Sequence, residues 1–183
     1  MELEEKLIHR KVVFQGRYVQ TEVRTVRLPD GKETTREIVS PPNAVAVLPI
    51  DASGNVHLVR QYRTALERVI LEIPAGILES GESSEETGRR ECEEEAGVIP
   101  ERMERLCSFY HSVGFSTGRI EIYLATGLTP SRNAHTEEGE YLERVVMPFD
   151  DLYRMVLSGA IVDSKTLVAV LWYHQKTEGR QGS

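Results

Sequence analysis

Residues 76–98 read GILESGESSEETGRRECEEEAGV, and this acidic stretch is the most informative part of the chain. Glu91, Glu94 and Glu95 have the spacing i, i+3 and i+4, so on a helix their side chains project from one face. Like charges at such spacings destabilise an isolated helix by about 0.2 to 0.5 kcal/mol per pair. Either the cluster is a solvated acidic surface, or divalent cations bind to it and offset the repulsion.

The flanking residues favour the second interpretation, because they frame the acidic cluster. A helix is predicted to begin near Ser83 or Ser84, with acidic residues in its first turn, and to end at Gly97. The segment EIPAG lies upstream at residues 72–76, and Arg90 directly precedes the acids. The cluster is therefore one part of a longer pattern.

The pattern consists of Gly76, five residues, Glu82, seven residues and the run REXEEEXGV at residues 90–98. It resembles the complete Nudix box, and this sequence has the expected residue at every fixed position of that motif. The departures are small: Cys92 takes an apolar position usually held by a larger aliphatic residue, and Gly88 lies in the helix interior. The resemblance implies a hydrolase that cleaves a nucleoside diphosphate linked to another group, with Mg²⁺ as the cofactor.

The resemblance also implies roles for individual residues. Glu91 and Glu95 become the leading metal ligands together with the carbonyl of Ala75, and Glu94 assists catalysis. Arg90 is expected to orient a carboxylate through a charge-assisted hydrogen bond. Mg²⁺ prefers octahedral oxygen coordination and keeps several waters, so carboxylates on a rigid helix suit it. We expect two or more Mg²⁺ ions, with Mn²⁺ as the alternative.

Features outside the box resemble the ADP-ribose pyrophosphatase branch of the family. An N-terminal β extension precedes the first buried strand, and QYR at residues 61–63 and the EIPAG segment are similar to that branch. The resemblance implies hydrolysis of ADP-ribose to AMP and ribose 5-phosphate by a homodimer that exchanges its N-terminal strands. Candidate substrate contacts are Arg63, Ile77 and Arg36 of the partner subunit, since a guanidinium suits bidentate phosphate contact.

The segment from Ser131 to Glu140 is predicted to be a catalytic loop. By the same resemblance, Glu138 is the expected base and Glu140 a metal contact, while an acidic loop without a catalytic role is the alternative. Val113 stands where the branch usually carries proline, so GDP-mannose or another nucleoside diphosphate sugar stays open as the substrate. A non-catalytic Nudix domain that senses a nucleotide sugar is a further alternative.

The composition excludes several other classes of protein. The chain has 183 residues, and its 22 basic and 29 acidic residues give a net charge of -7, which argues against nucleic acid or an anionic membrane as a partner. Cys92 and Cys107 suit neither a disulfide scaffold nor a zinc site, and are predicted to be buried small hydrophobes. The first ten residues are not a secretory signal, which predicts a cytoplasmic location.

The predicted elements are strands, a helix, strands and two helices, which indicates a mixed α/β (α+β) fold with a mixed central sheet sandwiched between helices. Two or more strands are expected between residues 12 and 39, and a buried strand over 44–50. Asp150, and either Asp163 or Ser164, are expected to cap the last two helices, and the final helix is expected to end at about Lys176. The predicted divisions are an N-terminal β extension for dimerisation and the substrate pocket (1–42), a Nudix hydrolase domain (43–176) and a disordered tail (177–183).

Overall fold

The computed structural model describes residues 3–132 and 141–181 and divides the chain into two compact units. Unit 1 contains residues 1–43 and 109–119, and unit 2 contains residues 44–108 and 120–183. The sequence did not predict that residues 109–119 belong with the N-terminal strands. They do so because the backbone of Val39 donates to Phe115 at 2.8 Å and accepts from Thr117 at 3.0 Å.

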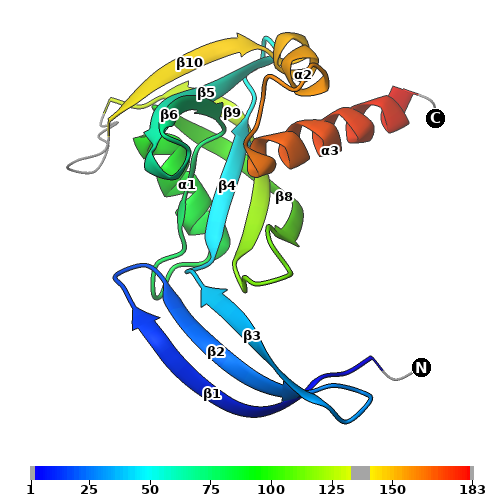
Figure 1. Ribbon diagram of the computed structural model, residues 1–183. Coiled ribbons are helices and arrows are strands. Elements are labelled where there is room, and N and C mark those ends of the chain that lie inside the picture. The colour runs from blue at the N-terminus through cyan, green and yellow to red at the C-terminus, as the bar shows by residue number, and fades with distance from the viewer. Residues whose placement is uncertain (1–2, 133–140, 182–183) are drawn as a thin grey trace. The chain divides into compact units, whose positions relative to one another are not determined.

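Unit 1 contains an antiparallel sheet in the order β1-β2-β3 (Figure 1). Its strands are β1 (Lys6–Gln15), β2 (Gln20–Arg27) and β3 (Glu33–Ser40). The predicted strands between residues 12 and 39 are therefore present, and the first of them begins earlier, at Lys6. Gly31 forms the β2–β3 turn with a φ of 87°, a conformation that glycine adopts without strain.

Unit 2 contains two sheets, one mixed and one antiparallel. The mixed sheet has the order β7-β4-β9-β8, with β4 parallel to β9 and antiparallel to β7, and the other sheet has the order β10-β5-β6. The strands are β4 (Ala44–Pro49), β5 (Asn55–Arg63), β6 (Arg68–Glu72), β7 (Ala75–Ile77), β8 (Val98–Tyr110), β9 (Arg119–Pro130) and β10 (Leu142–Pro148). A short 3₁₀ turn, Thr64–Leu66, connects β5 to β6.

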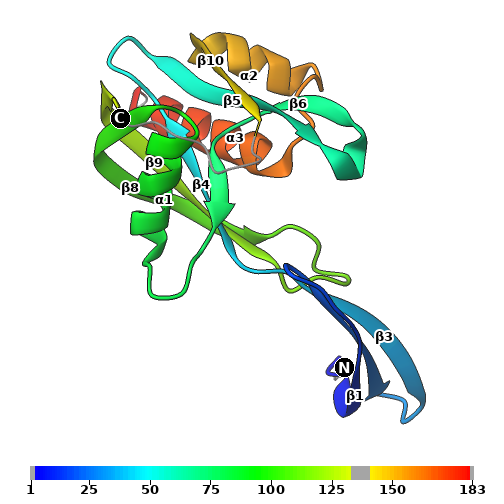
Figure 2. The same cartoon turned by 90° about the vertical axis from the view of Figure 1, so that its left-hand side faces the viewer.

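The helices of unit 2 are α1 (Ser84–Glu94), α2 (Phe149–Leu157) and α3 (Ser164–Gln181). Helix α1 packs against β4 and β7, and α3 lies on the other side of β4 (Figure 2). Helix α2 contacts β10, β5 and α3. The expected mixed sheet between helices is confirmed, although the strands form two sheets rather than one.

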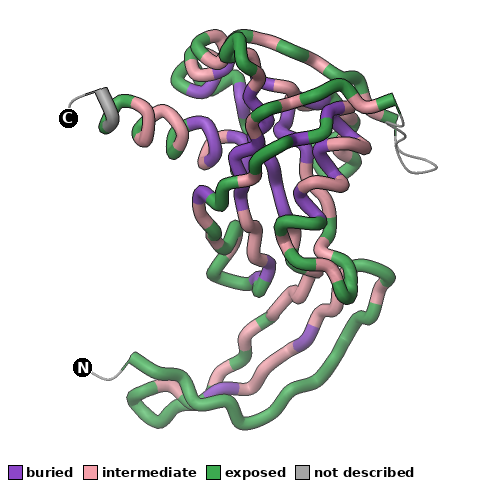
Figure 3. Tube along the Cα trace, turned by 180° about the vertical axis from the view of Figure 1, so that it is seen from behind, coloured by how far each residue is buried: buried purple, intermediate pink, exposed green. Residues whose placement is uncertain are grey.

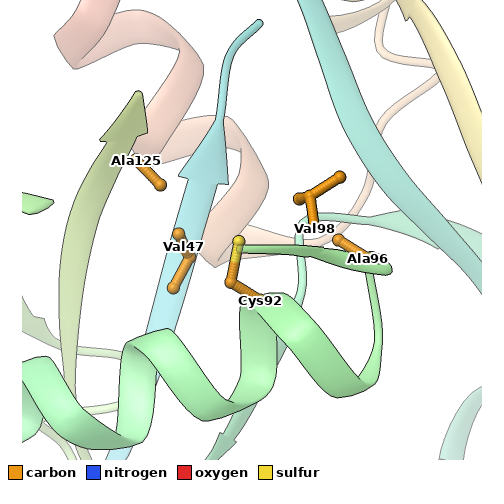
Figure 4. Close-up of a cluster of buried hydrophobic side chains, with 5 residues drawn as sticks. All are labelled: Val47, Cys92, Ala96, Val98 and Ala125. Carbon is orange, nitrogen blue, oxygen red and sulfur yellow. The ribbon is translucent and has the colours of Figure 1, made fainter. Parts of the chain in front are cut away.

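The core lies along β4, whose residues are almost fully buried (Figure 3). Val45 and Val47 face α1, and a side-chain carbon at Gly88 would lie 3.4 and 3.3 Å from their methyl groups. Glycine at this position therefore lets the helix approach the strand closely. Cys92 packs in the same layer, with Val47, Ala96, Val98 and Ala125 around it (Figure 4). Burial raises the pKa of the Cys92 thiol to about 12, as suits an inert hydrophobic residue.

Two helix boundaries differ from the sequence expectation. Helix α2 begins at Phe149 with Pro148 as its N-cap, so Asp150 lies inside the first turn rather than at the cap. Asp163 caps α3 as predicted, since its Oδ2 accepts from the backbone of Thr166 at 3.0 Å. Helix α3 continues to Gln181, beyond the predicted end at residue 176, because one glycine among good helix formers does not stop a helix.

Candidate active site

Helix α1 begins where the sequence predicts it. Ser83 is the N-cap, with its Oγ accepting from the backbone of Glu86, while the Glu86 carboxylate accepts from the backbone of Ser83 at 2.8 Å. This capping box satisfies two backbone donors that a helix start leaves unpaired. At the other end, Gly97 has a φ of 73° and terminates the helix. Local signals therefore fix both ends of the segment that carries the acidic cluster.

Glu91 lies against the backbone of Gly76 in β7. A side-chain carbon at residue 76 would lie only 1.8 Å from Oε1 of Glu91, well inside van der Waals contact. Glycine is therefore required here for close approach, because any larger residue would displace the carboxylate. Glu91 is 7% exposed, so this position also removes most of the side chain from solvent.

Glu95 is a second buried carboxylate that reaches the same strand. It is 5% exposed, and its Oε2 accepts a hydrogen bond from the backbone of Ala75 at 2.8 Å. Gly76 and Ala75, which are neighbours in β7, thus each lie against a carboxylate. Glu91 lies in the last turn of α1, and Glu95 is the C-cap residue one turn further on. The fold brings together Ala75, Glu91 and Glu95, which the sequence predicts to be metal ligands.

The chemistry of these groups fits a hard divalent cation. Carboxylates and a backbone carbonyl supply the oxygen ligands that Mg²⁺ prefers, and Mg²⁺ retains several of its waters. Within the ranges 3–132 and 141–181, no three acidic, histidine or cysteine side chains converge closely enough to enclose a metal. A cation at this place would therefore depend on water and substrate oxygens as well as on the protein.

Arg90 joins the carboxylates of the box into one network. Its Nη1 donates to Glu91 at 2.6 Å and to Glu94 at 3.1 Å, and its Nε and Nη2 donate to Glu82 at 3.1 and 3.3 Å. Burial opposes its charge, but the hydrogen bonds and charges of the three glutamates outweigh this effect and raise the pKa of Arg90. Arg90 is thus permanently charged, and its geometry suits a residue that orients carboxylates.

The loop between β7 and α1 is attached to the helix through two further contacts. Glu82 accepts from Thr87 Oγ1 at 2.8 Å, and the carbonyl of Ile77 accepts from Arg90 at 3.4 Å. The hydrogen bonds from Arg90 and Thr87 lower the pKa of Glu82, so it stays ionised. The Ile77 side chain is 38% exposed.

Both arginines that the sequence predicts to contact substrate have carboxylate partners. Arg63, at the end of β5, donates from Nε and Nη2 to Glu72 at 2.6 and 2.8 Å. Arg36, in β3 of unit 1, donates from Nη2 and Nε to Glu5 at 2.6 and 3.2 Å. Neither pairing was predictable from the sequence, because nothing in the spacing of these residues indicates it.

Arg144, in β10, contacts the end of α1 beside the candidate site, and the sequence did not reveal this contact. Its Nε and Nη2 donate to the carbonyls of Glu95 and Glu94, each at 2.9 Å, and so cap the C-terminal end of α1. Ser131 contacts the same end, since its backbone donates to Gly97 at 2.9 Å. These residues flank the segment that contains Glu138 and Glu140, the predicted base and metal contact, which lie outside the described residues.

Comparisons with known proteins assign the family that this site defines. A model of the NUDIX domain matches residues 40–169, which is more than half of the chain. The chain belongs to the Nudix family of hydrolases. A solved structure titled as an ADP compounds hydrolase has the same fold, with a TM-score of 0.88 and 21% identity over 98% of each chain.

Several curated relatives share nearly the whole chain. A methanol dehydrogenase activator of Bacillus methanolicus is 43% identical and covers 91% of each chain. An ADP-ribose pyrophosphatase of Bacillus subtilis is 38% identical over 95% of each chain. An ADP-ribose pyrophosphatase of Mycobacterium tuberculosis is 36% identical over 94% of this chain and 82% of its own.

Proposed function

We propose that this protein is a metal-dependent pyrophosphatase that hydrolyses ADP-ribose to AMP and ribose 5-phosphate. The observation that carries the proposal is the pair of buried carboxylates, Glu91 and Glu95, placed against adjacent residues of β7. The names of the relatives from Bacillus subtilis and Mycobacterium tuberculosis support ADP-ribose as the substrate. Mg²⁺ is the proposed cofactor, with two or more ions, and Mn²⁺ is the alternative.

The reaction consumes one water for each pyrophosphate bond. Water attacks one phosphorus, the bridging P–O bond breaks, and both products leave as phosphate monoesters. Bound Mg²⁺ neutralises phosphate charge and makes water more acidic. Glu91, Glu95 and the Ala75 carbonyl would hold the cation, and Glu94 would assist. Arg90 would keep the carboxylates oriented through its hydrogen bonds to Glu91 and Glu94.

Residues outside the box complete the proposed catalytic centre. Glu138 accepts the proton of the attacking water, and Glu140 contributes to the metal site. Ser131 and Arg144, which lie on either side of these glutamates in the sequence, both contact residues at the C-terminal end of α1. Because α1 carries Glu91, these contacts support the proposed role. Activity should therefore depend on Glu138 more than on an exposed acidic residue elsewhere.

The substrate is recognised through its diphosphate and its sugar. Arg63 is proposed to contact the diphosphate, and the exposed side chain of Ile77 to line the pocket. Arg36 of the partner subunit is proposed to approach the nucleotide in a homodimer with exchanged N-terminal strands. The apolar exposed residues of β1 support such an assembly. The proposed location of this activity is the cytoplasm. As a separate finding, no helix among the described residues is long and apolar enough to cross a membrane.

A substrate panel tests the proposal directly. The protein is incubated with Mg²⁺ and ADP-ribose, GDP-mannose or other nucleoside diphosphate sugars, and products are separated and identified by mass. AMP and ribose 5-phosphate should form fastest from ADP-ribose. Faster release of GMP from GDP-mannose would identify GDP-mannose as the substrate instead of ADP-ribose. Tight binding without any turnover would favour a sensing domain.

A variant at Glu95 tests the metal assignment. Glu95→Gln should lower kcat/KM by about 100- to 1,000-fold, because an amide cannot provide the charge that a cation requires. Glu85→Gln is the matched control on the same helix, since Glu85 pairs with Arg89 and lies outside the site. Undiminished activity of a folded Glu95→Gln protein would exclude Glu95 as a ligand.

A second candidate function follows from the relative in Bacillus methanolicus, whose name is that of a methanol dehydrogenase activator. This candidate requires a partner protein rather than only a small substrate. It is tested by adding the purified protein to methanol dehydrogenase and measuring the rate of methanol oxidation. An increase that is lost with Glu95→Gln would indicate that activation depends on the same site.

A further inference from the structure

Glu72 is a charged residue in a place that disfavours charge. It ends β6, is 1% exposed, and lies three residues before Ala75 of the candidate site. A buried carboxylate is unfavourable unless it is paired and hydrogen-bonded. Two cations from distant parts of the chain provide the pairing: Arg63 on one side and Lys165 on the other.

Arg63 holds Glu72 with two of its three nitrogens. The Nε–Oε1 and Nη2–Oε2 distances are 2.6 and 2.8 Å, which is the fork-to-fork geometry of a bidentate pair. Within the part of the chain that the structure describes, no hydrogen bond from Nη1 is seen, and the side chain is 41% exposed. One edge of Arg63 is therefore fixed, while the other is available to a ligand.

Lys165 lies in the first turn of α3, and its side chain is 9% exposed. Its ammonium group forms ion pairs with Oε2 of Glu72 and, at 3.1 Å, with Asp163. Burial pushes the pKa of Glu72 upward, but the hydrogen bonds and charges of Arg63 and Lys165 outweigh burial and lower it. Glu72 therefore stays ionised and shares its charge between two cations.

The same turn of α3 also holds the chain that enters the candidate site. Thr166 Oγ1 accepts from the backbone of Ile73 at 2.9 Å, and the carbonyl of Pro74 accepts from the backbone of Val47 at 2.9 Å. The next residue, Ala75, is bound by Glu95. Ile73, Pro74 and Ala75 are thus each held by a hydrogen bond. Since Arg63 is bound to Glu72, the residue before Ile73, its position is linked through this segment to the predicted metal ligands.

We propose that Lys165 is a positioning residue that lets Glu72 hold Arg63 without neutralising it. Arg63 and Lys165 together face two carboxylates, Glu72 and Asp163. Lys165 offsets negative charge that would otherwise act on Arg63, so Arg63 keeps positive charge for the diphosphate of the substrate. This inference rests on the proposed function, because it takes the substrate to be a nucleoside diphosphate sugar. Without Lys165, Glu72 would compensate Arg63 alone, and the attraction for a polyanion would fall.

The test compares Lys165→Met with Lys176→Met, which removes a lysine of the same helix that pairs with Glu104. Lys165→Met should raise KM for ADP-ribose by about 3- to 10-fold and change kcat by less than about twofold. Lys165→Arg should restore most of the affinity, because it returns the charge. If Lys165→Met does not fold, Lys165→Gln carries the test, since its amide still donates to Glu72 but adds no charge.

Binding of ADP-ribose in the presence of EDTA, measured by calorimetry, gives a second readout that needs no turnover. The dissociation constant should rise in Lys165→Met by a similar factor and stay unchanged in Lys176→Met. A wild-type protein that binds ADP-ribose but does not cleave it with Mg²⁺ would refute the proposed function and leave this comparison intact. Equal KM and dissociation constants for the two folded variants would refute the role of Lys165.

Discussion

Gly76 shows how the absence of one side chain can define a catalytic position. Gly76 is not one of the glycines with a positive φ, so its importance is steric rather than conformational. The space that a methyl group would occupy is filled by the carboxylate of Glu91. A substitution here therefore acts on the site while leaving the strand conformation allowed.

We predict that Gly76→Ala lowers kcat/KM by about 100-fold or more, since small displacements of catalytic groups have effects of this size. The methyl group would meet Glu91 at 1.8 Å and force the carboxylate away from β7. Gly179→Ala is the control, because a side-chain carbon at Gly179 meets nothing within 4 Å. Steady-state kinetics of both variants check the prediction; equal activity would mean that Glu91 acts from another position.

The ionisation of Glu72 predicts a pH dependence of stability. Its pKa in the folded protein lies below the ordinary value of 4.5, so its stabilising contribution is present above that pH and is lost as the pH falls through the folded value. The free energy of unfolding of wild type should therefore exceed that of Glu72→Gln at pH 7, and the difference should shrink below about pH 4.5. Urea denaturation between pH 7 and 3 measures it, and a difference independent of pH would contradict it.

At the scale of the element, α1 depends on a residue from another strand to complete its end. Arg144 donates to the carbonyls of Glu94 and Glu95, which lie at the end of the helix where carbonyls lack partners within the helix. We predict that Arg144→Met lowers the free energy of unfolding by about 1 to 2 kcal/mol and also reduces kcat.

The control for Arg144 is Arg60→Met, in the adjacent strand β5, where an exposed ion pair with Glu143 should contribute less than about 1 kcal/mol. Chemical denaturation and kcat are measured on all three proteins. Equal losses in the two variants would show that Arg144 contributes no more than an ordinary surface charge.

The same element shows how far the sequence alone could be interpreted. The start, end and acidic face of α1 were predictable because the capping box, Gly97 and the i, i+3, i+4 spacing are local signals. Gly88 was recognisable as a glycine in the helix interior, but its neighbours Met103, Val45 and Val47 appear only in the fold. Elements are thus predictable where the determining residues are neighbours in the chain.

Long-range partners were not predictable for the opposite reason. Arg144 lies 49 residues from Glu95, and Lys165 lies 93 residues from Glu72. A lone basic residue in a strand or helix has no spacing that distinguishes a buried ion pair from a surface charge. For the same reason the sequence predicted Arg63 as a phosphate contact but not as the partner of Glu72.

At the scale of the whole molecule, the outermost strand of unit 1 suggests a protein that associates with itself. β1 is an edge strand and is exposed throughout, with large apolar residues at Leu7, Ile8, Val12, Val13 and Phe14. An exposed apolar edge is a site where another chain can add. Oligomeric state is therefore a property that β1 should control.

We predict that light scattering finds a dimer, with twice the 20.7 kDa of one chain. Lysine at both Val12 and Val13 should shift the protein to monomers, because charged residues on an edge oppose association. Lysine at Leu157, an apolar residue on α2 that is at least as exposed as Val12 and Val13, is the control. A monomeric wild type, or a dimer that persists with both lysines in β1, would contradict the prediction.

The contact between Glu72 and Lys165 also has a consequence for synthesis on the ribosome. The carboxylate is made 93 residues before its second counter-charge, an interval of roughly 5 to 20 s at ordinary elongation rates. During that time the nascent chain can form β4 to β7 and α1, but Glu72 has only Arg63 to compensate it. The environment of Arg63 is therefore complete only when the first turn of the last helix has emerged, so a chain that terminates before it should bind the substrate more weakly even with every residue of the Nudix box in place.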